Sequence, residues 1–301
     1  MRELIITAND SGQRADRFIS KLMPGLPLSM LYKGLRKKCV KLNGKHLKDG
    51  SVFLNAGDVL TLYFKDEFFK KPDSFSYVTP ELDIVYEDEN IIVVNKAVGV
   101  LSHADESGKG ITLIDMLKSY LYDTGEYEPE KEQSFSPALC NRLDRNTGGL
   151  VICAKNASSL REMNRAIKER QIQKFYTAIA TGHTPEKGHI KSGLIRKNKV
   201  TRVSESGKEA ELFYTKKAEK DNLSLLEIEL KTGRTHQIRT QLAHMGHPLL
   251  GDTKYGGDGT KFRQSLWSTR LIMSFDKGSP LSYLDGKEIS VSAPFEKKFK
   301  E

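Results

Sequence analysis

The chain has 301 residues, of which 38% are hydrophobic and 29% are charged, and its net charge is +9. That length allows one large domain plus a small one, and no apolar run approaches the roughly 20 residues that a membrane-spanning helix needs. The first residues lack the long apolar region of a signal peptide, and the three cysteines show no paired spacing, so we expect a cytoplasmic protein.

The positive charge is concentrated near the N-terminus. Residues 1–64 carry 11 Lys and Arg against 5 Asp and Glu, which is +6 of the total of +9. A small basic module on a nearly neutral body indicates a polyanionic partner, most simply a nucleic acid. A solubilising surface is the alternative interpretation, and charge alone does not exclude it.

Residues 12–64 have the pattern of a compact module. Residues 17–22 are expected to begin a first helix, which ends at Pro24. A second helix is expected to start with Ser29 as its N-cap. The second helix has an apolar face of Met30, Leu31 and Leu35 and a basic face of Lys33, Arg36, Lys37 and Lys38. A strand running into the Asn43-Gly44 turn then gives a strong hairpin signal.

The charged, proline-containing residues 65–80 are typical of a linker, although their aromatic side chains indicate that they pack against the protein. The body begins with a hairpin whose second strand ends at Lys96. This lysine could line the site, but a lone lysine after a strand is more often solvated, and we expect that here. A helix over 112–122 follows, with leucines at i, i+4 and i+8. The polar residues 123–136 are expected to form a loop that either reaches toward the substrate or is mobile.

An acidic residue between two arginines marks the next loop. Arg142, Asp144 and Arg145 precede a Thr-Gly-Gly turn and a buried apolar strand at 150–154. A carboxylate on a loop at the mouth of a strand is well placed to meet a ligand, and it suits a nucleophile or an electrostatic partner. From spacing alone, a surface network of ion pairs is the simpler explanation.

The rest of the body is predicted to be mainly strands around two helices. The strands are expected at 173–182, 190–195, 210–215, 225–230, 270–275 and 288–291, and the helices at 158–170 and 235–246. In the second helix Ile238, Leu242 and Met245 share one face, and His236 and Arg239 share another. His236, His244 and His247 invite a metal site, but no carboxylate–histidine spacing accompanies them, so we expect none.

Several segments resemble the signature motifs of the RluA-type pseudouridine synthases. NRLDRNTGG around Asp144 resembles HRLDRxTSG, residues 95–103 resemble NKPxGxxxH, and residues 174–182 resemble KxYxAxxxG. The longest match is GRTHQIRTQLAHMGHPLLGD at 233–252. The chain departs from the family's pattern at Ala97, Asn141, Gly148 and Gln241. Residues 12–64 are similar to the S4 RNA-binding domain in the order of their elements.

The resemblance implies an enzyme that isomerises uridine to pseudouridine in RNA, pointing to the large ribosomal subunit. It implies Asp144 as the catalytic carboxylate, Arg239 as its ion-pair partner, Tyr176 stacked on the target base, and Arg142 in the gap left by the flipped uridine. No cofactor is expected, because a C–N bond is exchanged for a C–C bond without redox change. The predicted RNA contacts are completed by Arg145, Lys33, Arg36, Lys37 and Lys38.

The expected fold class is α+β. It combines a catalytic domain at 81–301, built on a large mixed and mostly antiparallel sheet with flanking helices, with a small N-terminal α/β S4-like domain at 1–66 and a linker at 67–80. We expect a monomer. Two other functions stay open: a non-catalytic RNA-binding or ribosome-assembly factor on the same fold, and an N-glycosidase that releases the base. The first would be expected to lack the acid or its arginine partner, and both are present.

Overall fold

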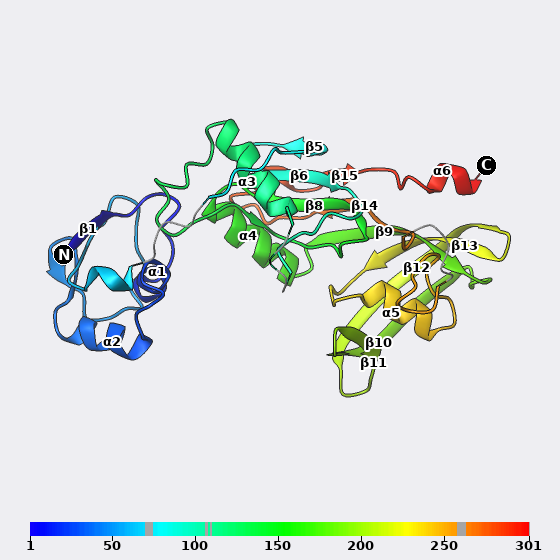
Figure 1. Ribbon diagram of the computed structural model, residues 1–301, viewed down its shortest axis with the longest axis horizontal. Coiled ribbons are helices and arrows are strands. Elements are labelled where there is room, and N and C mark those ends of the chain that lie inside the picture. Colours follow the sequence, from blue (N-terminus) through cyan, green and yellow to red (C-terminus); the bar gives the residue numbers. More distant parts are fainter. Residues whose placement is uncertain (70–74, 106–107, 109, 258–262, 301) are drawn as a thin grey trace.

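The computed structural model describes residues 1–69, 75–105, 108, 110–257 and 263–300. These residues form two sheets, one of four strands and one of eleven. The small sheet lies at one end of the molecule with the N-terminus, and the large sheet extends toward the C-terminus (Figure 1). No helix among these residues is long and apolar enough to cross a membrane.

The small sheet and two helices form an N-terminal module with its own hydrophobic core. The elements are β1 (Arg2–Ile5), α1 (Ala15–Leu22), α2 (Leu28–Arg36), β2 (Val40–Leu42), β3 (Lys45–His46) and β4 (Val59–Leu62), with sheet order β1-β4-β2-β3. The predicted hairpin is confirmed: Asn43 and Gly44 link β2 to β3 with φ of 50° and 76°. Every buried member of this core lies between Ile6 and Phe69.

Two predicted details of α2 are wrong. The helix begins at Leu28 and its N-cap is Pro27, so Ser29 lies in the first turn and makes no side-chain cap. Leu31 and Leu35 are buried as expected, but Met30 is 44% exposed because it does not share their face of the helix. The basic residues Lys33, Arg36, Lys37 and Lys38 are all exposed.

The large sheet is mixed but mostly antiparallel, as predicted. Its order is β11-β10-β12-β13-β9-β14-β8-β6-β5, with β15 on β14 and β7 on β8. The late strand β14 (Leu266–Met273) does not lie at an edge but joins the two halves, pairing antiparallel with β9 (Ile172–Thr181) and parallel with β8 (Gly148–Ala154). The other members are β5 (Ile84–Glu87), β6 (Ile91–Lys96), β7 (Ala138–Leu139), β10 (Lys187–Lys197), β11 (Val200–Val203), β12 (Lys208–Lys220), β13 (Leu223–Leu230) and β15 (Glu288–Ser290).

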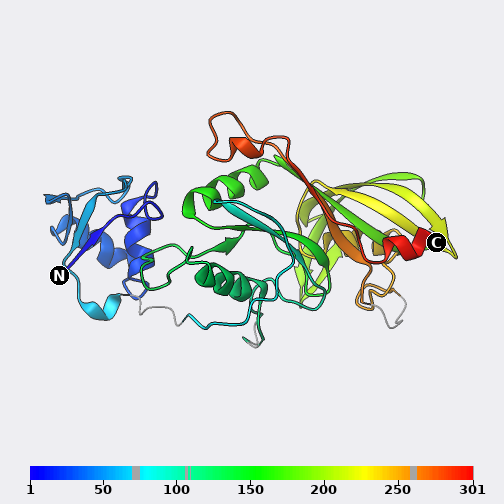
Figure 2. The same cartoon turned by 90° about the horizontal axis from the view of Figure 1, so that it is seen from above.

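Helices cover both faces of the sheet around β6 and β8. Apolar side chains alternate along β6, with Ile92 and Val94 in one core and Ile91 and Val93 in another. The first core receives α3 (Leu113–Asp123) and α5 (Gln237–His244), and the second receives α4 (Ala157–Lys168). Figure 2 shows α3 and α4 on opposite sides of these strands. A short α6 (Glu296–Lys300) and the 3₁₀ turns Asp66–Phe68 and Ser282–Leu284 complete the chain.

The 123–136 loop contacts the N-terminal module. Glu132 accepts a hydrogen bond from Asn9 at 2.8 Å, and Ser134 donates to the buried Asp10 at 2.6 Å. Asn9 also accepts from the backbone of Ala157 at the start of α4, at 3.1 Å. The expectation that this loop is free to reach the substrate or to move is therefore wrong, because it bridges the two sheets.

Candidate active site

The Asp144 loop is held from two sides. On the β8 side, Asn141 accepts a hydrogen bond from the backbone of Ile152 at 2.8 Å, so the asparagine continues the strand pairing. On the other side, Gly99 N donates to Arg145 O at 2.8 Å, and Ser102 Oγ donates to Leu143 O at 2.9 Å. The Asp144 carboxylate is therefore presented by a loop whose backbone is fixed on both flanks.

Lys96 is part of this support, and the expectation that it is solvated is wrong. Its side chain is 2% exposed. Nζ donates to Ala97 O and Val100 O, both at 2.9 Å, and to Arg145 O at 3.4 Å. Burial lowers the pKa of Lys96 to about 8, while the negative charge of Asp144 opposes that shift. Lys96 thus ties the segment after β6 to the Asp144 loop.

The predicted ion pair between Asp144 and Arg239 is present. Arg239 Nη1 donates to Asp144 Oδ2 at 3.0 Å. The same guanidinium also binds the buried Asp252, which accepts hydrogen bonds from Nε at 2.7 Å and from Nη2 at 2.8 Å. Such a two-bond pairing fixes the guanidinium plane. One nitrogen is left to point at Asp144, so the direction of the ion pair is set by Asp252.

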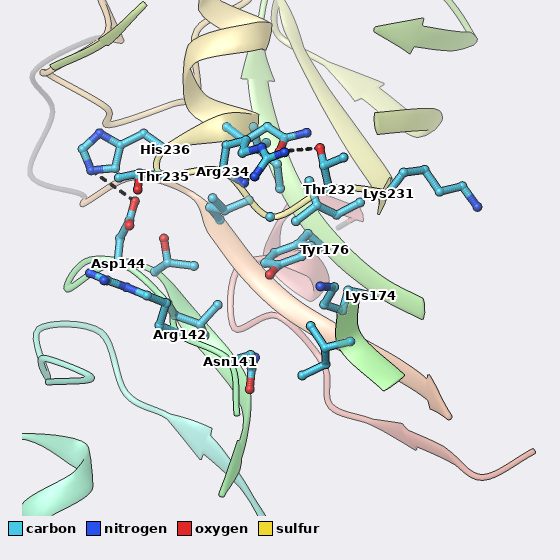
Figure 3. A pocket seen from close by; sticks show the side chains of 18 of the residues that line it. Asn141, Arg142, Asp144, Lys174, Tyr176, Lys231, Thr232, Arg234, Thr235 and His236 are labelled. Carbon is cyan, nitrogen blue, oxygen red and sulfur yellow. Dashed lines mark hydrogen bonds and ion pairs between the residues drawn. The ribbon is translucent and has the colours of Figure 1, made fainter. Parts of the chain in front are cut away.

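His236 approaches Asp144 from the turn before α5. Its backbone has φ of 55°, so it lies outside the helix in a left-handed conformation rather than on a helical face as predicted. Its Nε2 is 3.6 Å from Asp144 Oδ2, and its Nδ1 is 2.7 Å from the Tyr255 hydroxyl. Figure 3 shows the Asp144 and His236 side chains meeting at one end of the pocket.

The surroundings of His236 favour one neutral tautomer. Burial lowers the pKa of His236 to about 4, against a smaller raising effect of Asp144. The Tyr255 hydroxyl already accepts from Thr201 N at 3.0 Å, which leaves its proton for His236 Nδ1. A proton on Nε2 then faces the Asp144 carboxylate, where a lone pair would be repelled.

A cleft of about 550 Å³ opens beside Asp144. Tyr176 lines it opposite Asp144 and is 6% exposed, and burial raises the pKa of its hydroxyl to about 12. Lys174, two residues earlier on β9, enters the same cleft (Figure 3). A second hollow of about 330 Å³ shares Asp144, Arg142 and Arg239 with the cleft, so the carboxylate stands between two cavities.

The structure brings together five of the predicted site residues. Asp144, Arg239, Tyr176, Arg142 and Arg145 all line these two hollows. Arg142 is exposed, and Arg145 Nε donates to Gly99 O at 3.1 Å. The other four predicted RNA contacts, Lys33, Arg36, Lys37 and Lys38, line neither hollow and lie in or directly after α2 on the separate N-terminal module.

Asp252 and Tyr255 are site residues to which the sequence analysis gave no role. His236 was considered there only as a metal ligand, and Lys96 was expected to be solvated. Asp252 and His236 fall inside the 233–252 motif and Lys96 inside the 95–103 motif, so motif membership was the available signal. The departure at Gly148 also has a structural reason: a Cβ there would lie 2.3 Å from the Trp267 ring. No group of three or more His, Cys, Asp and Glu among the described residues is arranged to hold a metal ion.

The comparisons with known proteins agree on one family. Residues 90–244 match the family model for RNA pseudouridylate synthase. An uncharacterized RNA pseudouridine synthase of Mycoplasma capricolum is 33% identical over 96% of this chain and 97% of its own. Ribosomal large subunit pseudouridine synthase C of Escherichia coli is 32% identical over 83% of this chain and 78% of its own.

Solved structures share the fold. Human RNA Pseudouridylate Synthase Domain Containing 1 superposes with a TM-score of 0.58 at 23% identity, over 76% of this chain and 89% of that one. Human RNA Pseudouridylate Synthase Domain Containing 4 gives a TM-score of 0.56 at 21% identity, over 70% of this chain and 88% of that one. At these identities the similarity shows that the chains share a fold.

Proposed function

The chain belongs to the RNA pseudouridylate synthase family and isomerises uridine to pseudouridine in RNA, and we propose that Asp144 is its catalytic carboxylate and ribosomal RNA of the large subunit its substrate. The observation that carries the first proposal is the ion pair of Asp144 with an arginine that is itself clamped, at the mouth of a cleft. The second proposal follows the named activity of the Escherichia coli relative.

The reaction breaks the bond between N1 of uracil and C1′ of ribose, turns the base, and joins C5 to C1′, and the proton on C5 is finally lost to solvent while N1 gains one. Both polar contacts of the Asp144 carboxylate, with His236 and Arg239, involve Oδ2. Among the described residues Oδ1 thus has no hydrogen-bond partner, and it is the oxygen available to attack C1′ or to accept the C2′ proton. Both routes stay open, and both use the same oxygen.

The neighbours of Asp144 have distinct proposed roles. Arg239 orients the carboxylate through its pairing with Asp252. Tyr176, protonated at neutral pH, offers its ring to the flipped uracil. Arg142, exposed between the two hollows, occupies the space that the uridine leaves in the RNA and offsets part of the unstacking free energy, a few kcal/mol.

The N-terminal module, residues 1–66, is proposed to be an S4-like RNA-binding domain joined by a linker at 67–80 to the catalytic domain at 81–301. Its exposed residues Lys33 and Arg36 lie in the last turn of α2 and the exposed Lys37 caps that helix, and such a basic helix end is suited to phosphate contacts. We further propose that the protein is a cytoplasmic monomer that uses no cofactor. Each of these assignments follows from the sequence patterns described above.

The direct test is to incubate purified protein with large-subunit ribosomal RNA from a strain that lacks its gene. Mass analysis and pseudouridine mapping are then done on the same sample. We expect new pseudouridines at defined positions with the RNA mass unchanged. Loss of uracil would identify an N-glycosidase, and binding without any change would identify a non-catalytic RNA-binding factor. Activity on another RNA alone would refute the assignment to the large subunit.

A further inference from the structure

A third hollow extends the cleft away from Asp144. Its volume is about 400 Å³. It shares five lining residues with the cleft: Ile167, Arg170, Lys174, Leu230 and Lys231. Its outer part is lined by Gln173, Glu211, Phe213 and Glu229. A ligand in the cleft can therefore continue into this hollow, which we call the flanking groove.

An exposed aromatic ring lines the outer part of the flanking groove. Phe213 lies in the middle of β12 and is 36% exposed, whereas its neighbours Leu212 and Tyr214 point into the core. One face of its ring stacks on His189 across the strand pair, with centroids 4.2 Å apart and an angle of 6° between the planes. His189 is held in place by Glu211 at 2.9 Å. The ring is thus braced on one side by His189, and the Lys231 ammonium group lies over it, 5.7 Å from the ring centroid. A base that stacks on Phe213 displaces this ammonium group, which is then free to meet the phosphate backbone.

A cation without a counter-charge lies where the cleft and the flanking groove meet. Lys174 lines both, and no hydrogen bond or ion pair to its ammonium group exists among the described residues. Burial is the sole cause that lowers the pKa of Lys174, and no carboxylate opposes it. An unpaired, partly desolvated ammonium group is unfavourable in the free protein, and a bound anion would relieve that penalty.

The acidic side chains of the flanking groove are already occupied. Glu229 pairs with Lys231, and Glu211 is hydrogen-bonded to His189. Arg170, beside Lys174, has only a distant carboxylate, Glu209, at 3.8 Å. The groove therefore offers the unpaired ammonium group of Lys174 at its inner end and the ring of Phe213 at its outer end. That combination is typical of sites for single-stranded nucleic acid.

We propose that the flanking groove binds an unpaired nucleotide of the RNA next to the target uridine, with its phosphate at Lys174 and Arg170 and its base stacked on Phe213. The inference rests on the proposed function, since the uridine must lie in the cleft beside Tyr176. Lys174 and Tyr176 stand two residues apart on one strand and face the same cleft. The spacing of roughly 6–7 Å between them lets one strand of RNA reach both.

The phosphate contact is tested with a fluorescent ten-nucleotide oligouridylate as the probe, by anisotropy titrations across salt concentrations. Lys174→Met should weaken binding and flatten the slope of log K against log salt by about 0.7, the contribution of one phosphate in a single strand. The matched control is Lys220→Met, an exposed lysine at the far end of β12, which should leave the slope unchanged. A wild-type slope for Lys174→Met would overturn the phosphate assignment.

The stacking contact is tested with a base-free probe of the same length. Phe213→Ala should weaken binding of the oligouridylate roughly 5- to 100-fold without changing its salt slope, and Phe213→Tyr should restore affinity because the ring is kept. An abasic oligoribonucleotide should bind wild type and Phe213→Ala equally. Equal loss of affinity for both probes would mean that Phe213 supports the fold rather than a base, and would overturn the proposal.

Pseudouridine formation separates this inference from the function on which it rests. In the same preparations, wild type should convert large-subunit ribosomal RNA, and Lys174→Met should raise KM with little change in kcat. If wild type converts the RNA but neither variant alters binding or KM, the groove inference fails alone. If wild type forms no pseudouridine, the proposed function fails whatever the groove binds.

Discussion

At the scale of single residues, the site depends on one guanidinium that serves two carboxylates. Arg239 uses Nε and Nη2 for the buried Asp252 and keeps Nη1 for Asp144. The two carboxylates differ in exposure: the side chain of Asp252 is 1% exposed and that of Asp144 is 25% exposed. The buried acid therefore acts as an anchor, and the half-exposed acid is the one that a ligand can reach.

Arg239→Lys should lower kcat strongly and change KM little. A lysine carries one compact ammonium group and cannot pair with Asp252 through two bonds while also reaching Asp144 in a fixed direction. Single-turnover rates at saturating RNA measure the effect. Asp252→Asn is the companion variant and should show the same loss of kcat, because it releases the guanidinium. Wild-type kcat in Asp252→Asn would mean that the anchor has no part in aiming Arg239.

His236 should make the protein less stable as the pH falls from 7 to 4. The folded protein keeps His236 neutral down to its pKa of about 4, whereas an unfolded histidine binds a proton near pH 6.5. Between these values the unfolded state binds more protons, so acid lowers the free energy of unfolding, by up to about 3 kcal/mol for this residue. Urea unfolding measures the free energy of unfolding of wild type and of His236→Gln, and the difference between the two proteins should shrink as the pH falls. The exposed His244 supplies the control, His244→Gln. Parallel curves for wild type and His236→Gln would contradict this burial effect.

Sequence patterns predicted part of this site. Asp144 and Arg239 are separated by 95 positions, and no spacing rule predicts that they pair. The pairing was expected only because the family motifs contain both residues. Lys96 was misjudged because a lysine after a strand is usually solvated. Here its ammonium group is bonded to the nearby carbonyls of Ala97 and Val100 and to that of Arg145, 49 positions away. His236 was placed on a helical face because the periodicity does not reveal a left-handed residue before the helix.

At the scale of elements, the parallel contact between β8 and β14 positions the Asp144 loop. Trp267 pairs with Gly148 and Ser268 with Gly149, directly after that loop. A Cβ on Gly148 would lie 2.3 Å from the Trp267 ring, and one on Gly149 would lie 2.2 Å from a backbone oxygen of Ser268. Two glycines thus allow the central strand to approach the loop.

Gly148→Ser should destabilise the protein by about 1–3 kcal/mol, because the added side chain overpacks against an indole that is 9% exposed. Trp267 is the only tryptophan in the chain, so its fluorescence during urea unfolding reports on this contact. In a protein that already carries Trp267→Leu, Gly148→Ser should lower the free energy of unfolding much less, because the effects of substitutions at contacting residues are not additive. Equal effects in both backgrounds would place the strain elsewhere.

Elements with strong patterns were predicted well, and their arrangement was not. The strand containing Tyr176 and the helix capped by Thr112 lie within one or two residues of their predicted bounds. Met245 was expected on the buried face of α5, but the helix ends at His244 and Met245 is 43% exposed. The central place of β14 depends on pairing with residues 88 to 119 positions away, which local patterns do not encode.

At the scale of the whole molecule, two units are joined by a segment and by polar contacts. The cores under the large sheet contain no residue before Phe75. The predicted packing of the linker aromatics is confirmed for Phe69, which is buried in the core of the module, and for Phe75, whose ring centroid lies 5.0 Å from that of Tyr122 in the body. Tyr77, in contrast, is 51% exposed. The described residues on either side of 70–74 therefore each contact the unit that they adjoin.

Deleting residues 1–66 should leave a folded body that binds RNA less tightly. Each lost phosphate contact should flatten the slope of log K against log salt by roughly 0.7–0.9. The body should keep its single-turnover rate at saturating RNA, because neither Asp144 nor any group that pairs with it lies in the module. A full-length variant with Lys33, Arg36 and Lys37 changed to Gln should show much of the same flattening. An unchanged slope in both proteins would mean that the basic helix is a solvated surface.

The central claim is that the Asp144 carboxylate carries out the isomerisation, and Asp144→Asn tests it most directly. The substitution keeps the size of the side chain, and Arg239 keeps its buried partner Asp252, so fold and RNA affinity should stay close to wild type. The account predicts that pseudouridine formation in large-subunit ribosomal RNA, measured under single-turnover conditions with saturating enzyme, falls by several orders of magnitude. A rate near that of wild type would contradict it.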